Sequence, residues 1–340
     1  MGKLRTSYRV VAVVLCAVLF GVVAAGCAQQ AKYPTKAINM IVGWAAGGMT
    51  DRLMRGISAL AEKQLGQPIV VTNMTGATSA IAVQHVYSQP ADGYTLLGSS
   101  ENPALFQVLD LSARSFDDFD PIILLAGSVP VILVHPDAPW KDIKELVADL
   151  KAKGKEIKMG HTGPGAQPFT VAVMMKTALG VDCTMVPYDG DAPVLTALMG
   201  KQIDFTVATG TSCIEYIRAG KVRPLASCAG QKVKGLENVP LMHEEVPEMK
   251  KYLPWGAFYG VFVKKGTPKD IQDKLLSAFK QAADSAEWKQ TLENMVAVPL
   301  GLTGEEATKY VKKWQSVTAW ILHEGGATKK SPADFNIPKP

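Results

Sequence analysis

A mostly apolar run that ends in a glycine-rich turn constrains the fold of this chain more than any other feature. Residues 38–42 read as a buried strand, and the turn that follows contains Gly47 and Gly48 just before Thr50 and Asp51. Glycine lets the backbone approach a ligand closely, and Thr50 can cap a helix that starts near Asp51. Strand, turn and helix start together predict a cradle of free main-chain N–H groups suited to an anion.

The first 26 residues are typical of a secretory signal. A positively charged start precedes an uninterrupted apolar run over residues 10–25. An uncleaved membrane anchor is the alternative, because the run approaches the length of a spanning helix. We expect cleavage, since Ala24-Ala25-Gly26-Cys27 resembles the bacterial lipoprotein signal, in which the cysteine is lipidated. Residues 27–36 would then form a lipidated tether.

The mature chain is nearly neutral, so its charge gives no sign of nucleic acid as a partner. The signal carries three of the 36 basic residues, Lys3, Arg5 and Arg9, and no acidic residue, which leaves 33 basic against 31 acidic residues. A balance of +2 creates no strong field for a polyanion or a polybasic membrane contact.

The cysteines of the mature chain beyond Cys27 match no metal-binding spacing, so we expect no metal and no cofactor. They are Cys183, Cys213 and Cys228. An odd count leaves at least one free thiol, and the sequence does not decide whether any two are bridged. Buried apolar positions are the simpler interpretation.

Apolar periodicity and turn residues divide the mature chain into alternating strands and helices. Strands are expected at 38–42, 68–72, 94–97, 157–159, 184–187 and 203–207. Helices are expected at 51–65, 80–88, 140–153, 169–179, 193–199, 268–283 and 305–323. Two longer β-rich stretches, 121–134 and 255–264, would carry the chain into a second domain and back. The alternation predicts an α/β fold with mainly parallel sheets covered on both faces.

Short motifs follow one another along most of the mature chain in an order that resembles a known family. They are Tyr33-Pro34, Gly47-Gly-Met-Thr-Asp51, Leu65-Gly-Gln-Pro68, Asn73, Gly76-Ala77, Asp92-Gly-Tyr-Thr-Leu-Leu97, Gly163-Pro-Gly165, Val186-Pro-Tyr188, Gly190, Ala192-Pro193, Gly200-Lys-Gln-Ile-Asp204 and Gly266-Thr-Pro268. No single motif is specific, but their order and spacing resemble the substrate-binding proteins of tripartite tricarboxylate transporters, the Bug or TctC-like family.

The resemblance implies an α/β, two-lobed fold like that of type II periplasmic binding proteins, with the ligand cleft between the lobes. Residues 37–128 and 260–340 would form the first lobe, and 129–259 the second. The N-terminal signal and Cys27 predict an exported protein, periplasmic or at the cell surface, that a lipid on Cys27 anchors to the membrane.

The resemblance further implies that loops of both lobes hold a ligand carboxylate, mostly through backbone groups and water. In the first lobe the candidate residues are Trp44, Gly48, Thr50, Asp51, Thr75, Ala77, Thr78, Ser79 and Ser100. In the second lobe they are His161, Thr162, Gly165, Ala166, Gln167, Tyr188, Asp189 and Asp204. Physical reasoning agrees, because loops between strands and helices place N–H donors at positive helix ends.

Several positions depart from the family pattern. Ala45-Ala46 stand where a proline is common, Thr78-Ser79 where glycines are typical, and Ala166 where serine is common. Asp189 points to solvent or pairs with a cationic group on the ligand. We therefore expect a ligand other than plain citrate.

Several candidates also have a structural interpretation. Trp44 is a cleft wall or a core aromatic, and Ser100 reaches the cleft or caps a turn. A lone histidine such as His161 more often makes a structural hydrogen bond, and Asp204 orients loop backbone or meets ligand. Tyr188 is expected to face the ligand, because a polar tip on a loop suits hydrogen bonding.

We expect a solute-binding lipoprotein that delivers a small organic carboxylate to the subunits of a membrane transporter. One alternative is a receptor that presents its ligand to a membrane sensor, and another is a periplasmic enzyme. The sequence contains no Gly-x-Ser-x-Gly elbow, no phosphate loop and no spacing that indicates a Cys/His pair, which favours binding over catalysis.

Overall fold

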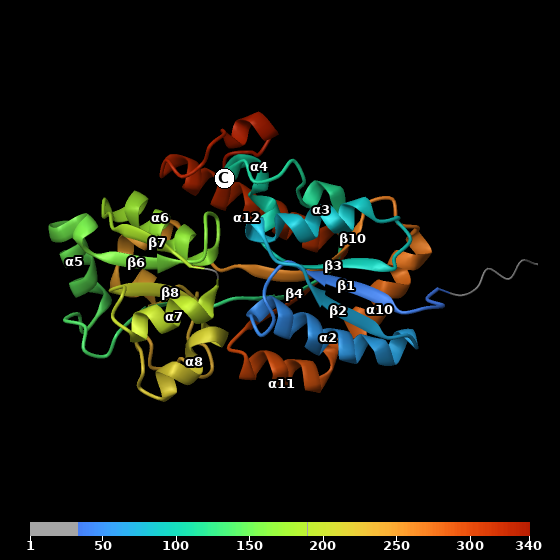
Figure 1. The fold of residues 1–340 in the computed structure, drawn as a ribbon, viewed down its shortest axis with the longest axis horizontal. Helices are drawn as coiled ribbons and strands as arrows, with labels where there is room; N and C mark the ends of the chain where they lie inside the picture. Colours follow the sequence, from blue (N-terminus) through green and yellow to red (C-terminus); the bar gives the residue numbers. More distant parts are fainter. Residues whose placement is uncertain (1–32, 189) are drawn as a thin grey trace, which may run out of the picture. The chain divides into compact units, whose positions relative to one another are not determined.

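The computed structural model describes residues 33–188 and 190–340, which form two β-sheets with helices on their faces (Figure 1). The predicted secretory signal (residues 1–26), Cys27 and Asp189 lie outside the described residues. Lys36–Pro340 forms one compact unit. Within the described part of the chain, no helix combines the length and the apolar character that crossing a membrane requires.

The first sheet has six strands in the order β11-β4-β10-β3-β1-β2. Their bounds are β1 Ile38–Val42, β2 Ile69–Asn73, β3 Thr95–Ser100, β4 Phe119–Gly127, β10 Phe258–Lys264 and β11 Val298–Leu302. Strand β1 is parallel to β2 and β3, but β10 is antiparallel to both β3 and β4, and β11 is antiparallel to β4. The prediction of a mainly parallel sheet is wrong, because the returning strand β10 enters against the direction of its neighbours.

The second sheet has five strands in the order β7-β6-β8-β5-β9. Their bounds are β5 Pro130–Val134, β6 Lys158–His161, β7 Thr184–Pro187, β8 Phe205–Thr209 and β9 Arg223–Ser227. Strand β6 is parallel to β7 and β8, whereas β5 is antiparallel to β8 and β9. This sheet is also mixed, since the incoming strand β5 runs against its neighbours.

The predicted crossing at 121–134 consists of two strands that belong to different sheets. Strand β4 ends at Gly127 and β5 begins at Pro130. Between them, the Ser128 N–H donates to the Ala257 carbonyl at 2.8 Å, and the Ala257 N–H donates to Ser128 Oγ at 2.9 Å. A Cβ on Gly256 would lie 2.3 Å from the Ser128 carbonyl oxygen, so glycine is required there. The outgoing and returning segments are therefore bonded to each other at the crossing.

Helices cover both faces of the first sheet, as the α/β prediction requires. Helices α2 (Met49–Leu65), α10 (Lys269–Asp284) and α11 (Ala286–Asn294) lie on one side, and α3 (Ala80–Ser88) and α12 (Gly304–Glu324) on the other (Figure 1). Helix α2 buries Leu53, Ile57 and Leu60 at helical spacing. It ends at Gly66, whose φ of 70° makes it the predicted C-cap.

The two faces of the second sheet pack on different helices. On β8, Phe205 and Val207 join one apolar cluster while Ala208 joins another. The first cluster contains α5 (Ile143–Lys153) and α6 (Gln167–Leu179), and the second contains α7 (Asp191–Met199) and α8 (Gly210–Arg218). This alternation along a strand is the expected result of burial on both faces.

The predicted fold class is confirmed, although four longer elements escaped the sequence analysis. They are α8, β9, α11 and β11. Pro299 and Gly301 lie within β11, and both residues weaken a strand signal; β11 occupies the sheet edge, where they are tolerated. The boundaries given for the two lobes stay a prediction.

Candidate functional site

Residues from both sheets line a cavity of about 520 Å³. From the side of the first sheet, the lining includes the turn 44–50 and residues 100–102. From the side of the second sheet, it includes residues 166–168 and 190–193 together with the start of α8. Of the predicted site residues, those in the lining are Trp44, Gly48, Thr50, Ser100, Thr162, Ala166 and Gln167.

Three helices begin at the cavity wall without a side-chain cap. The N-cap residues of α2, α6 and α7 are Gly48, Ala166 and Gly190, and none makes a side-chain hydrogen bond to its helix. Glycine and alanine have no side-chain acceptor, so first-turn N–H groups such as those of Thr50 and Gln167 have no acceptor among the described residues. Each helix start carries a partial positive charge, and three of them at one cavity favour an anion.

A fourth helix, α8, also begins at the cavity but is capped. The Ser212 N–H donates to Thr209 Oγ1 at 3.2 Å. The hydroxyl of Thr209 satisfies one of the free amides that a helix start leaves, as an N-cap threonine does. The amides available to a ligand are therefore concentrated at α2, α6 and α7.

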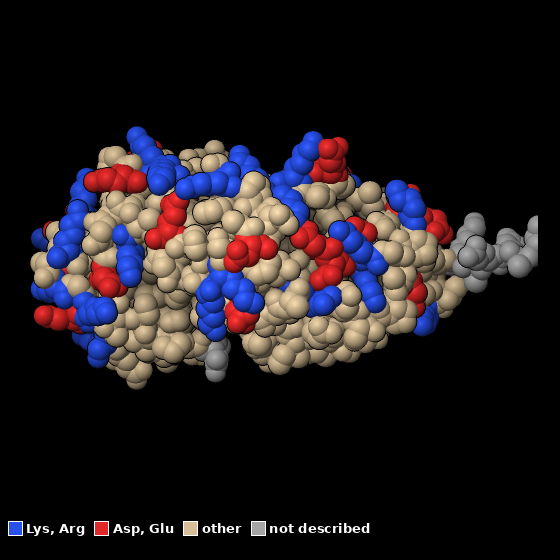
Figure 2. Space-filling view, turned by 90° about the horizontal axis from the view of Figure 1, so that it is seen from above, with Lys and Arg blue, Asp and Glu red and all other residues tan. Residues whose placement is uncertain are grey.

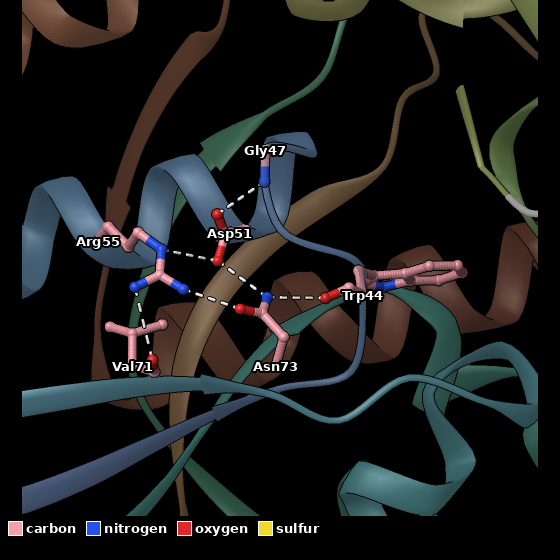
Figure 3. A network of polar contacts seen from close by, with 6 residues as sticks. All are labelled: Trp44, Gly47, Asp51, Arg55, Val71 and Asn73. Carbon is pink, nitrogen blue, oxygen red and sulfur yellow. Dashed lines mark hydrogen bonds and ion pairs between the residues drawn. The ribbon is translucent and has the colours of Figure 1, made fainter. Parts of the chain in front are cut away.

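A carboxylate braces the turn that opens α2 (Figure 3). The Gly47 N–H donates to Asp51 Oδ2 at 2.9 Å, and Oδ1 accepts from Arg55 Nε at 2.9 Å and from Asn73 Nδ2 at 2.8 Å. The same Asn73 amide donates to the Trp44 carbonyl at 2.8 Å. These bonds tie both ends of the turn to β2 and to the first turn of α2.

The carboxylate of Asp51 has its acceptors occupied and lies outside the cavity lining. Burial on its own would raise the pKa of this carboxyl, but hydrogen bonds from Arg55, Gly47 and Asn73 hold the pKa below the ordinary value of 3.8. The prediction placed Asp51 against the ligand. In the structure Asp51 has a supporting position, in which it fixes the turn that lines the cavity, and its contact with ligand stays a prediction.

Trp44 and Ser100 form a polar pair in the cavity wall. Trp44 Nε1 donates to Ser100 Oγ at 2.9 Å, and Ser100 Oγ donates to Asn102 Oδ1 at 2.7 Å. Trp44 is half-buried and Ser100 is buried. Of the two interpretations of Trp44, the wall of the cleft is the one that its place in the lining supports.

Two buried polar side chains in the lining have an atom without a hydrogen-bond partner. Glu101 is 3% exposed, and its Oε2 has no hydrogen-bond partner among the described residues. Gln167 is 5% exposed, and its Nε2 also has no partner among them. The other end of the Gln167 amide accepts from the Ser128 hydroxyl. Buried polar atoms without partners are rare in folded proteins, so this pair indicates a place for ligand atoms or water.

Burial changes the charge of the carboxyl at Glu101. It raises the pKa of Glu101 to about 8, so the group is mostly neutral at pH 7. Burial also raises the pKa of Tyr259, with the charges of Glu101 and Asp191 adding to the effect. The sequence analysis missed these three lining residues. A carboxylate directly after a predicted strand end was the available signal for Glu101, whereas Tyr259 reads as core from its strand.

Three candidates of the second lobe lie outside the cavity lining. His161 is buried, its Nδ1 accepts from the Gly163 N–H at 3.1 Å, and burial lowers its pKa. Asp204 Oδ2 accepts from the Lys158 N–H at 2.7 Å, which is the backbone-orienting alternative. The ring of Tyr188 packs beside Gly160 on the apolar cluster of α7 and α8, so it does not reach the cavity.

The loop before α3 and Gly165 also lie outside the lining. The four loop candidates are Thr75, Ala77, Thr78 and Ser79. The last three have left-handed backbone with φ of 46°, 53° and 74°, and Ser79 is buried with its hydroxyl unpaired within the described chain. Gly165 packs against Leu105 and Leu109, where a Cβ would lie 2.5 Å from Leu109 Cδ1. Its role is close packing.

A second, smaller cavity of about 220 Å³ lies beside α6 and β7. Its lining is mostly apolar, with Phe169, Val173 and Met185 among its residues, and contains none of the predicted site residues. The larger cavity is therefore the candidate site.

Neither metal chemistry nor a polyanion surface emerges from the described residues. Within 33–188 and 190–340, no group of His, Cys, Asp and Glu side chains could hold a metal ion, and Cys183, Cys213 and Cys228 are free thiols. On the face drawn in Figure 2, basic and acidic side chains both occur along its width. Such mixing differs from the single-sign patch of nucleic-acid binders.

Comparison with known proteins identifies relatives over most of the chain. The family model described as the tripartite tricarboxylate transporter family receptor matches residues 53–322. Protein BugT of Bordetella pertussis is 29% identical over 304 residues, which cover 88% of this chain and 92% of BugT.

Two solved binding proteins carry ligands. MatC from Rhodopseudomonas palustris, solved with bound malate, is 28% identical to this chain with a TM-score of 0.74. The match covers 84% of this chain and 100% of MatC. An R. palustris protein solved with adipate is 25% identical to this chain with a TM-score of 0.81. The match covers 87% of this chain and 99% of the R. palustris protein.

Proposed function

Since this chain belongs to the tripartite tricarboxylate transporter receptor family, we propose that it captures a small organic carboxylate outside the cytoplasm and delivers it to a membrane transporter. The observation that most directly supports carboxylate capture is the convergence of three uncapped helix starts on one cavity. Oriented N–H groups and positive helix ends stabilise an anion without a cationic side chain.

The residues we propose to contact the ligand come from both sides of the cavity. They are Trp44, Gly48, Thr50 and Ser100 with Thr162, Ala166 and Gln167. In this proposal, residues 37–128 and 260–340 move against residues 129–259 about the crossing segments. A ligand that contacts both lobes favours the closed form by the free energy of those contacts.

The ligands of two structural neighbours support a small dicarboxylate or a related acid. MatC holds malate and the second R. palustris protein holds adipate. Their shared feature is a pair of carboxylates on a short chain, and a cavity of about 520 Å³ has room for such a molecule.

We also propose that residues 1–26 are removed on export and that a lipid on Cys27 anchors the mature protein. Replacing Cys27 by Ser should move the protein from the membrane fraction to the soluble fraction of the cell envelope. Equal membrane recovery of both forms would contradict the anchor.

A thermal-shift screen of carboxylic acids tests ligand capture, because a ligand that binds only the folded state raises Tm. The panel includes malate, adipate and succinate. The site-specific variant is Ala192→Glu, which adds a carboxylate to the exposed first turn of α7 within the cavity lining. The matched control is Ala286→Glu, which adds the same group to the exposed first turn of α11, outside the lining.

Both variants place an acid where a helix dipole tolerates it, so both should fold. The wild type and Ala286→Glu should show the same rise in Tm with a given acid, and Ala192→Glu should lose that rise through charge repulsion. A rise that Ala192→Glu retains would contradict the placement of the ligand, and a panel without any rise would contradict carboxylate capture.

A further inference from the structure

Glu101 is a buried acid in the wall of the candidate cavity. It follows the end of β3, is 3% exposed and lines the cavity from the side of the first sheet. Its Oε2 has no hydrogen-bond partner among the described residues. An ionised carboxylate would repel an anionic ligand, so an acid at this position of an anion site needs an explanation.

Burial decides the protonation state of Glu101. Its carboxyl hydrogen-bonds to the Ser100 side chain and to the main-chain N–H of Glu101 itself, and neither group is a cation. Burying an ionised carboxylate without a cation beside it is costly. These two hydrogen bonds lower the pKa, but burial has the larger effect and raises the pKa to about 8. Glu101 therefore keeps its proton for most of the time at pH 7.

A protonated carboxyl can donate a hydrogen bond, whereas an ionised carboxylate only accepts. The lining has a second buried polar atom without a partner in the described chain, Gln167 Nε2, and this amide nitrogen is a donor as well. Gln167 lies in the first turn of α6, on the side of the second sheet. Glu101 and Gln167 thus offer the cavity two neutral donors from opposite sides.

We propose that Glu101 binds the ligand as a carboxylic acid, with its proton on Oε2 donated to a carboxylate oxygen of the ligand. This inference rests on the proposed function and names a residue that sets the affinity and its dependence on pH. The main-chain amides at the starts of α2, α6 and α7 are permanent donors. The donor of Glu101 exists only while its proton is bound, and a neutral buried acid suits this task.

Binding then has a defined proton balance. Well below pH 8 the carboxyl already carries its proton, and none is exchanged with solvent. Well above pH 8 the complex takes up to one proton from solvent, because the negative ligand raises the pKa of Glu101 further. The affinity therefore falls as the pH rises through about 8. The other titratable or charged groups in the described lining are Arg52 on α2, Asp191 on α7, Glu215 and Tyr216 on α8, and Tyr259 on β10.

Isothermal titration calorimetry at pH 7 and pH 9 measures this dependence. The probe is the member of the panel of malate, adipate and succinate that raises Tm most, and its carboxylates stay ionised over this range. The dissociation constant should rise about tenfold from pH 7 to pH 9, as the protonated fraction of a group with a pKa of about 8 falls. At pH 9, titrations in buffers of different ionisation enthalpy should show the uptake of close to one proton.

Two substitutions at Glu101 separate the donor from its titration. Glu101→Met removes the donor and should weaken binding about tenfold or more at pH 7. Glu101→Gln restores an N–H donor that does not titrate, so it should bind more tightly than Glu101→Met and show no difference between pH 7 and pH 9. The control Glu305→Gln, at an exposed position in the first turn of α12 outside the lining, should keep the wild-type pH dependence.

The wild-type titrations decide the matter even if both Glu101 variants fail to fold. A dissociation constant that is unchanged or lower at pH 9, or binding at pH 9 without proton uptake, would overturn the protonated donor. So would a pH dependence that survives in Glu101→Gln, or equal binding by Glu101→Met and Glu101→Gln. Each of these results still includes binding of an acid and leaves the proposed function standing, whereas no binding of any acid would overturn both.

Discussion

Replacing Asp51 by Asn tests whether the brace at the turn matters to the fold and the site. The wild-type carboxylate accepts hydrogen bonds from Gly47, Arg55 and Asn73 through its two oxygens. The substitution keeps one oxygen acceptor but removes the other and the negative charge. The Arg55 side chain is 49% exposed and Gly47 is exposed, so water can replace those two bonds at small cost. The Asn73 amide is half-buried, so water replaces its lost hydrogen bond less well and the loss costs more free energy. We expect the free energy of unfolding at pH 7 to fall by about 2 kcal/mol.

Urea denaturation at several pH values measures this effect and its cause. The pKa of Asp51 in the folded protein lies below its ordinary value of 3.8. The stabilisation is therefore fully present above that value and is lost as the pH falls through the lower, folded-state pKa. The difference between wild type and Asp51→Asn should be constant from pH 7 to pH 5 and should shrink below pH 3.8.

An exposed ion pair with the same spacing supplies the control. Asp273 pairs with Lys269 on α10, and both side chains are more than half exposed. Asp273→Asn should change the free energy of unfolding by less than about 0.5 kcal/mol. An equal effect of the two substitutions, or an Asp51→Asn effect that persists unchanged at pH 3, would refute the role of the Asp51 charge.

Three further predictions concern backbone strain, packing and thiol reactivity. Thr78→Gly should raise the free energy of unfolding by about 1 kcal/mol in urea melts, because φ is 53° at this position; a loss of stability would contradict strain there. Gly160→Ala should lower it by about 1–3 kcal/mol, since the new Cβ would lie 2.4 Å from Ile203 Cδ1, and unchanged stability would show that the strand can shift. Cys213 and Cys228 are fully buried and burial raises the pKa of both thiols, so they should react with a thiol reagent at pH 8 only after unfolding. Fast labelling of these two thiols in the native protein would contradict this.

The sequence predicted the local elements around the site because each carries its own signal. Residues 38–42, the turn at Gly47-Gly48 and the apolar period of α2 act over short distances and needed no tertiary information. The same holds for Ala166 and Gln167, which come from a glycine-containing loop before a helix. Seven predicted residues reached the cavity for this reason.

The remaining parts depend on contacts between distant segments, which the sequence analysis could not resolve. The antiparallel entry of β5 and β10 follows from the path between two sheets. Tyr188 is diverted to packing beside Gly160, and Asp51 is used to hold the turn. The importance of Glu101 appears only when its burial and its missing partner are known.

The most direct test of ligand capture is a crystal structure of the mature protein with the acid that raises Tm most. We expect a ligand carboxylate oxygen within about 3 Å of main-chain N–H groups at the start of α2 and at the start of α6 or α7. A ligand bound outside this cavity would contradict the account. A ligand held only by side chains, all of them from the part of the protein around one of the two sheets, would also contradict it.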